Sequence, residues 1–183
     1  DQYRARYALY KSDPSLQAAH AAAPWLYVWD DHEVENDYAN DRGQDFSGAP
    51  FLRQRVAAYQ AYWEHQPLPK SARPQGPDMR IYGRTDWGRL ARIHAVDDRQ
   101  YRDPQACHKP DRVGGSNTVY AMDCPALQDP RRTLLGAPQE QWLAEGWDVQ
   151  RPWNLLAQQT LMARFAWQDP TDPRSRGGQV WTD

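Results

Sequence analysis

Hydrophobic and polar positions alternate along the chain in short runs that clusters of Pro and Gly interrupt. In the opening stretch YRARYALYKSDPSLQAAHAAAP, tyrosines recur at helical spacing and an alanine-rich run follows, which predicts helix as far as Pro24. Ser12 or Asp13, directly before Pro14, would cap a second helical turn.

The next two elements are predicted from a change of pattern. Trp25–Trp29 is aromatic and β-branched and lies between Pro24 and carboxylates, which predicts a short buried strand. Pro50–His65 has helical periodicity and ends before the Pro-rich stretch QPLPKSARPQGP. The face predicted to point inward consists of Leu52, Val56, Tyr59 and Trp63.

A β-hairpin is predicted from the stretch MRIYGRTDWGRLARIHAVDD. Its first strand would be Arg80–Tyr82, its turn would be Asp86–Gly88, and its second strand would be Leu90–Val96. His94 belongs to the alternation of the second strand.

Two further elements complete the prediction. The stretch TLLGAPQEQWLAEG has the pattern of a helix that starts at Pro138 and stops at Gly146. WNLLAQQTLMARF predicts one more core strand, although its length also permits a helix. The order of strand, helix, hairpin, helix and strand indicates an α/β fold built in layers.

Acidic residues follow two of the predicted strands. The stretch WDDHEVEND packs five carboxylates, one histidine and one asparagine into nine residues, and Asp97 and Asp98 follow the hairpin. Because ligands in open α/β folds gather beyond the carboxyl ends of strands, both runs are expected at the same edge. The carboxylates would repel one another unless a cation is bound or most of them point into water. The alternative is a solvated acidic turn, with Asp37 capping a helix.

Length and composition narrow the class of protein. The chain has 183 residues, enough for one domain, and a formal net charge of -2, which argues against a dedicated nucleic-acid binder. No apolar run approaches the length of a membrane span. Nine Trp and ten Tyr against three Phe favour rings with a polar group, which often line pockets or interfaces. A carbohydrate- or polymer-binding module without catalytic activity is therefore an alternative.

The two cysteines lie at the ends of a loop rich in Pro, Gly, Asp and Asn. Cys107 and Cys124 would suit a disulfide in an exported protein, and two free thiols are the alternative. A zinc site made of these cysteines and His108 lacks a fourth ligand at metal-site spacing and is the least favoured reading.

Several stretches carry a family resemblance. PWLYVWDDHEVENDYA, RVAAYQAYWEHQPLP, WGRLARIHAVDDRQYR, RTLLGAPQEQWL and WNLLAQQTLMA resemble successive blocks of the PhoD-like alkaline phosphatases and phosphodiesterases, within the calcineurin-like metallophosphoesterase superfamily. The resemblance implies part of a four-layer αββα sandwich and a phosphate-ester substrate. It also implies iron with calcium as metals, and export to the periplasm, the cell surface or the medium.

The resemblance also implies roles for individual residues. DDHE takes the place of the superfamily's Gly-Asn-His-Glu motif, so Asp31 would be a metal ligand and His32 the histidine that faces the scissile phosphate. Asp30, Asn36 and Asp37 would shape the pocket. Arg99 could place a guanidinium near the phosphate, although an ion pair with a neighbouring carboxylate, Asp97 or Asp98, is favoured.

The same resemblance implies that residues 1–183 are a partial PhoD-like domain. The family's earlier metal motifs would precede Asp1 and a later one would follow Asp183, so the isolated segment is expected to be inactive and to expose apolar sheet surface. In the complete enzyme, removing metal is expected to lower stability. A metallohydrolase acting on other esters stays an alternative. Monoester or diester preference, metal identity and oligomeric state stay open.

Overall fold

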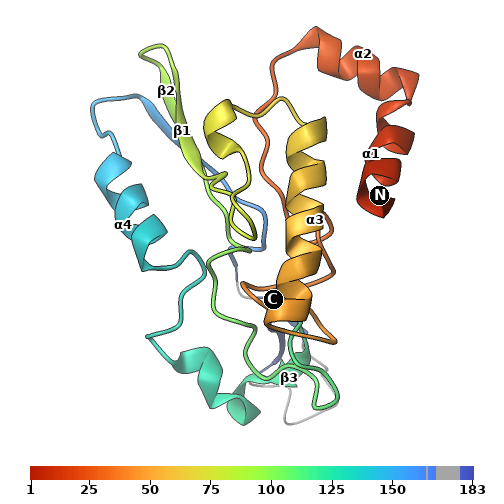
Figure 1. Ribbon diagram of the computed structural model, residues 1–183. Helices are drawn as coiled ribbons and strands as arrows, with labels where there is room; N and C mark the ends of the chain where they lie inside the picture. The colour runs from red at the N-terminus through yellow and green to blue at the C-terminus, as the bar shows by residue number, and fades with distance from the viewer. Residues whose placement is uncertain (164, 168–177) are drawn as a thin grey trace.

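The computed structural model describes residues 1–163, 165–167 and 178–183, in which helices surround two small sheets (Figure 1). The predicted α/β class is confirmed. In chain order the helices and strands are α1 (Gln2–Lys11), α2 (Pro14–Ala22), α3 (Ala49–His65), β1 (Gly83–Trp87), β2 (Ala91–Ala95), β3 (Thr118–Tyr120), α4 (Ala137–Gly146), β4 (Trp153–Ala157), β5 (Ala166–Trp167) and β6 (Gln179–Trp181). Short 3-10 helices occur at η1 (Lys70–Ala72), η2 (Ala121–Asp123) and η3 (Pro125–Gln128).

The opening helical stretch forms two helices, α1 and α2, as its cap predicts. The Asp13 carboxylate accepts a hydrogen bond of 2.9 Å from the backbone N–H of Leu16, and Pro14 is the first residue of α2. The helix ends at Ala22, before Pro24. The predicted helix that starts with Pro138 and stops at Gly146 is likewise confirmed as α4.

The first sheet has the strand order β1-β2-β4, in which β1 and β2 form the predicted hairpin and β4 runs parallel to β2. The predicted first strand, Arg80–Tyr82, is wrong, because the strand is Gly83–Trp87. Asp86, predicted to lie in the turn, instead pairs with Arg92 across the ladder, with an ion pair of 2.8 Å. The chain then turns at Gly88, whose φ is 54°. His94 lies in β2, as expected, and is fully buried.

The two faces of this sheet have different surroundings. On one face, α4 packs against β1 and β2 (Figure 1): the His94 ring stacks on Trp147 at 5.3 Å, and Arg84 lies 4.2 Å from the Trp142 ring centre. On the other face, Trp87 and Trp153 flank Ala91 in register and are 60% and 61% exposed. This exposed apolar face agrees with the expectation from sequence. The four-layer sandwich, which would place a second sheet there, stays a prediction for the whole protein.

The hydrophobic core lies between α3 and the chain around Trp29. The Trp29 ring is fully buried and stacks on Tyr59 with the ring centres 4.2 Å apart. Its indole N–H donates a 2.9 Å hydrogen bond to Asp97, which follows β2. Trp29 therefore joins the acidic turn to the end of the hairpin. Other buried members of this core are Val34, Tyr38, Phe51, Ala58, Tyr62, Ala72 and Met79.

The predicted inward face of α3 is correct at Tyr59 and in part at Trp63, which packs against the core, but it is wrong at Val56. Val56 is 37% exposed, whereas Arg55 is almost completely buried. Arg55 donates hydrogen bonds to the carbonyl oxygens of Pro77 and Asn40, which compensates the cost of burying its guanidinium. Because a buried arginine interrupts the apolar pattern of the inward face, apolar periodicity alone points to the neighbouring face, which includes Val56. The buried face consists of Phe51, Arg55, Ala58, Tyr59, Ala61 and Tyr62.

The predicted strand at Trp25–Trp29 is also wrong. Trp29 is buried, but Trp25 and Leu26 are 45% and 54% exposed, and the segment is not part of a sheet among the described residues. Aromatic and β-branched residues favour a pleated, half-buried surface, but a strand forms only where a partner supplies the ladder.

The predicted strand in WNLLAQQTLMARF forms only over its first five residues, as β4. The chain then leaves the sheet: Gln159 and Thr160 instead donate hydrogen bonds to Val96 and Asp98. Arg164 lies outside the described residues. Within the described part of the chain, no helix is long and apolar enough to cross a bilayer.

The second sheet has the strand order β3-β6-β5 and lies at the other end of the molecule, beside a disulfide. Cys107 and Cys124 form this disulfide across a separation of 17 residues. Their sulfur atoms are bonded to each other, so the zinc alternative does not hold. Cys124 directly precedes η3, and the intervening loop supplies β3.

The Trp29–Asp97 hydrogen bond can be tested with Trp29→Phe. Phenylalanine keeps a ring against Tyr59 but removes the indole donor from a fully buried carboxylate, which should lower the free energy of unfolding by about 1–3 kcal/mol. Trp153→Phe, at a site that is 61% exposed, is the matched control and should change it by less than about 0.5 kcal/mol. Equal losses in denaturant unfolding of the two variants would contradict the role of Trp29.

The disulfide should contribute roughly 3 kcal/mol to stability, because it closes a loop of moderate length in the unfolded chain. The double variant Cys107→Ser/Cys124→Ser should therefore unfold at lower denaturant concentration than the oxidised protein. Peptide mapping without reduction checks the bond itself. Two freely alkylated thiols in native, unreduced protein would contradict it.

Candidate functional site

The acidic stretch after Trp29 forms a compact turn, which the buried side chain of Asp31 stabilises through hydrogen bonds to the backbone of the turn. The Asp31 carboxylate accepts hydrogen bonds from the backbone N–H groups of His32 (3.0 Å) and Asp37 (2.6 Å). The Asp31 carbonyl accepts from Val34 and Glu35. Asp31 is 7% exposed, so the turn closes around its side chain.

Each of the other carboxylates in this turn also has a donor. Glu33 accepts from the backbone N–H of Asp30, and Glu35 from the backbone N–H of Gln44. Asp37 has a positive φ of 55°. Its carboxylate accepts a 2.5 Å hydrogen bond from the hydroxyl of Ser116, which lies in the loop that the disulfide closes. Backbone and side-chain donors therefore offset much of the repulsion that the sequence alone suggests.

His32 lies at the surface of the turn, with its side chain 77% exposed. Its Nε2 is 2.9 Å from Asn36 Oδ1 and 3.8 Å from Asp31 Oδ2. Because an amide oxygen only accepts hydrogen bonds, this geometry places a proton on Nε2. Asn36 and Asp31 thus orient an accessible imidazole.

Arg99 is in an ion pair, as favoured from sequence, but its partners are not the expected Asp97 or Asp98. Its Nε donates to Asp30 at 2.7 Å, and Nη1 and Nη2 donate to the two carboxylate oxygens of Asp183 at 2.8 and 2.7 Å. Burial opposes the charge of Arg99, but the hydrogen bonds and charge of Asp183 raise its pKa overall. The guanidinium is 2% exposed and is committed to carboxylates.

Asp183 is the centre of this ion-pair network. Besides the two bonds from Arg99, its carboxylate accepts from Arg102 at 3.1 Å and from Gln105 at 2.8 Å. Burial alone would raise the pKa of Asp183, but the hydrogen bonds and charge of Arg99, together with the charge of Arg102, lower it. For Asp30, burial has the larger effect and raises the pKa, against the opposing influence of Arg99.

Asp97 and Asp98 are buried behind the turn. Asp97 accepts from the Trp29 indole and from the backbone N–H groups of Arg99 and Gln100, and burial raises its pKa. Asp98 Oδ2 accepts from the Thr160 hydroxyl and N–H, while Oδ1 is buried without a hydrogen-bond partner among the described residues. The two acidic runs therefore lie close together, as expected from sequence, although only the second run follows a strand.

A pocket of about 280 Å³ opens over these residues, and we call it the acidic pocket. It brings together all six residues singled out from sequence as catalytic, metal-binding or pocket-forming. Sequence reasoning missed the other five lining residues, although Gln159 and Thr160 follow the end of β4, where the strand-end rule could have found them. The lining consists of Asp30, Asp31, His32, Asn36, Asp37, Arg99, Gln159, Thr160, Leu161, Trp181 and Asp183.

The acidic pocket does not by itself hold a metal ion. Among the described residues, no three His, Cys, Asp or Glu side chains converge at metal-ligand geometry. Both Asp31 oxygens accept backbone hydrogen bonds, and both Asp183 oxygens accept from cationic side chains. A metal centre would therefore need donors beyond those of the described residues.

Comparisons with known proteins agree with this architecture. Residues 1–183 match the family model of PhoD-like phosphatase. Alkaline phosphatase D of Bacillus subtilis (strain 168) is 46% identical over 167 residues, which cover 89% of this chain and 27% of that protein. A solved structure described as the structure of PhoD superposes with a TM-score of 0.83 at 41% identity, covering 98% of this chain and 32% of the other. The chain thus spans about a quarter to a third of these relatives, and it belongs to the PhoD-like phosphatase family.

Proposed function

We propose that the protein containing this chain hydrolyses phosphate esters, with the phosphate bound at the acidic pocket. The observation that carries the proposal is the position of His32, an accessible imidazole at the pocket of a chain that matches a phosphatase family over its whole length. Hydrolysis of a phosphate ester requires a proton for the leaving alkoxide, and histidine is the commonest side chain that supplies one.

His32 is proposed as the proton donor to the leaving group. Its Nε2–H is held by Asn36 and can be redirected to an ester oxygen, because the ring is exposed and its partner is a single neutral amide. Asn36 is therefore a positioning residue: in the imidazolium form of His32, which is the form that can give up a proton, its amide oxygen accepts from Nε2–H and orients the ring.

Asp31 is proposed to have two roles. It holds the turn through two backbone hydrogen bonds, and its remaining lone pairs would provide one carboxylate to a metal centre completed by donors outside the described residues. Asp30, Asp37 and Arg99 are proposed to shape the pocket. Arg99 acts through Asp30 and Asp183, not by direct contact with phosphate.

Metal dependence is proposed for the whole protein, with iron and calcium as the metals that family resemblance implies. Export to an oxidising compartment is proposed as well, and the Cys107–Cys124 disulfide supports it, because such bonds persist outside the cytosol. No donor arrangement among the described residues selects between the two metals.

A substrate panel tests the proposed activity. The full-length protein should release phosphate or alcohol from phosphate monoesters or diesters and leave carboxylic esters intact, whereas residues 1–183 alone should show little turnover. Hydrolysis of carboxylic esters only, or metal-independent carbohydrate binding without turnover, would contradict the proposal in favour of the two alternatives.

His32→Ala in the full-length protein should lower kcat by about 10²- to 10⁴-fold, the usual cost of losing a general acid, while metal content stays unchanged. The loss should be largest for esters with poor leaving groups, because these depend most on protonation. His108→Ala, at a histidine outside the acidic pocket, is the matched control. Normal turnover of poor leaving groups by His32→Ala would remove the assigned role.

Asp31→Ala in the full-length protein should lose metal and nearly all turnover, and the lost hydrogen bonds should lower the free energy of unfolding by about 1–3 kcal/mol. Elemental analysis and denaturant unfolding separate the two effects. Asp111→Ala, at an exposed carboxylate, should change neither quantity. Metal content near wild type in Asp31→Ala would leave Asp31 with the turn-holding role alone.

A further inference from the structure

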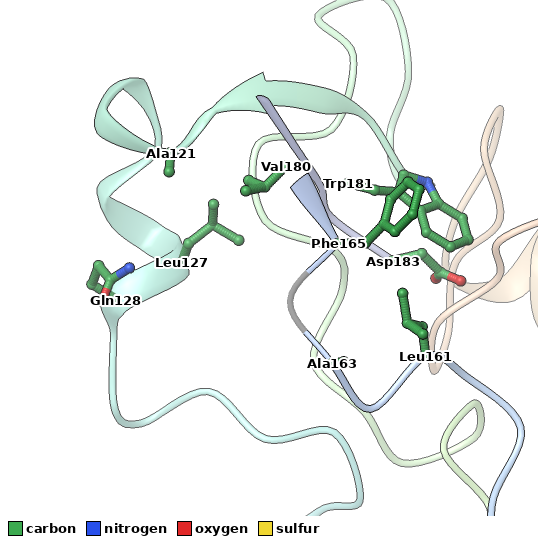
Figure 2. Close-up of a pocket in the computed structure, with 9 residues that line it drawn as sticks. All are labelled: Ala121, Leu127, Gln128, Leu161, Ala163, Phe165, Val180, Trp181 and Asp183. Atoms are coloured by element: carbon green, nitrogen blue, oxygen red, sulfur yellow. The ribbon is translucent and has the colours of Figure 1, made fainter. Parts of the chain in front are cut away.

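A second pocket adjoins the acidic pocket and shares part of its wall. This pocket, of about 260 Å³, is shown in Figure 2, and we call it the apolar pocket. Leu161, Trp181 and Asp183 line both pockets, so these side chains form the wall that the two pockets share. The other lining residues of the apolar pocket are Ala121, Leu127, Gln128, Ala163, Phe165 and Val180.

The apolar pocket presents hydrophobic side chains from segments far apart in sequence. Leu127 comes from η3 on one side, and Leu161, Phe165 and Trp181 gather near Asp183 on the other (Figure 2). Leu161 is 50% exposed and Trp181 is 40% exposed. Apolar surface exposed beside a polar site is typical of a region that contacts ligand.

We propose that the apolar pocket binds the aryl or alkyl part of the alcohol group of a phosphate ester whose phosphate lies in the acidic pocket. This inference rests on the proposed function and adds the substrate class to it. With the phosphate beside His32, an apolar alcohol group would extend past Trp181 toward Leu127. Burying that group removes apolar area from water on both sides of the contact.

The polar groups of the apolar pocket also favour an uncharged occupant. Asp183 and Gln128 are the described lining residues with a carboxylate or amide side chain. The Asp183 carboxylate is already bound by Arg99, Arg102 and Gln105. A charged group would therefore find no free ionised side chain among the described lining residues, and losing its water would cost free energy.

The wall that carries Leu127 is anchored before any ligand binds. The Leu127 N–H donates to the carbonyl of Cys124, which the disulfide ties to Cys107. On the floor, Val180 of β6 pairs with Val119 of β3. A preformed wall loses little conformational entropy when a ligand binds. The free energy gained from the apolar contact can therefore appear as a preference for ligands with a larger apolar group.

The test compares two esters whose phenols have similar acidity and differ only in an apolar tail: para-methylphenyl phosphate and para-butylphenyl phosphate. The full-length protein should show a kcat/KM about 10-fold higher for the butyl ester. Leu127→Ala should lower kcat/KM for the butyl ester to near that of the methyl ester and so abolish most of this preference. Leu134→Ala, a leucine that is 37% exposed and outside both pockets, is the matched control and should keep the preference.

Two additional variants guard against misfolding as an explanation. Leu127→Met conserves volume and should keep the preference, whereas Ala121→Leu narrows the pocket from η2 and should lower it. Equal kcat/KM for the two esters in the wild type would overturn the proposal. The same result is expected if another part of the full-length polypeptide fills the pocket, and it would overturn the proposal in that case too. An unchanged preference in both Leu127→Ala and Ala121→Leu would overturn it too.

Calorimetric binding of para-methylbenzyl- and para-butylbenzylphosphonate separates this inference from the proposed function. Tighter binding of the butyl compound, lost in Leu127→Ala, supports the apolar pocket even if neither ester is hydrolysed. In that case the proposed hydrolysis fails and the binding site stands. Equal affinities for the two phosphonates would overturn the apolar pocket whatever the turnover.

Discussion

The buried ion pair between Arg99 and Asp183 holds the functional end of the molecule together. Arg99 follows the hairpin, Asp183 follows β6, and Asp30 begins the acidic turn. One guanidinium therefore joins three segments: Asp30 lies 69 residues from Arg99 in sequence, and Asp183 lies 84 residues from it. Burying charge costs free energy, and these groups compensate it through bidentate geometry and through added donors from Arg102 and Gln105. Removing Asp183 would leave the buried guanidinium of Arg99 with Asp30 as its remaining carboxylate partner among the described residues.

This network places a polar pocket and an apolar pocket side by side. Asp183 and Trp181 come from the end of β6 and line both, while His32 faces only the acidic pocket. The acidic pocket has the accessible imidazole and the carboxylates, and the apolar pocket has leucine and aromatic side chains. A phosphate ester has the same division, with a charged phosphate and an alcohol group of variable character. In the proposed function, the acidic pocket would hold the phosphate and the apolar pocket would select the alcohol group.

The unusual aromatic composition has a structural explanation in this chain. Trp29, Tyr38 and Tyr59 are fully buried, and each uses its polar group: Trp29 donates to Asp97, and the two tyrosine hydroxyls lie 3.2 Å apart. Burial raises the pKa of Tyr38 and Tyr59 well above the usual range, so both stay protonated. Other tryptophans, such as Trp87 and Trp153, cover the open face of the first sheet.

The sequence by itself determined what depends on neighbours in the chain. The Asp13 cap, the helix from Ala137, the hairpin and the acidic turn follow from local hydrogen bonding, Pro and Gly conformation, and side-chain alternation. Only the tertiary structure decided what depends on distant partners. It buried Arg55 and so selected the inward face of α3, it left Trp25–Trp29 without a partner strand in the described chain, and it gave Arg99 to Asp30 and Asp183. Burial of a charge and pairing of a strand are settled by groups far away in sequence, which no local pattern encodes.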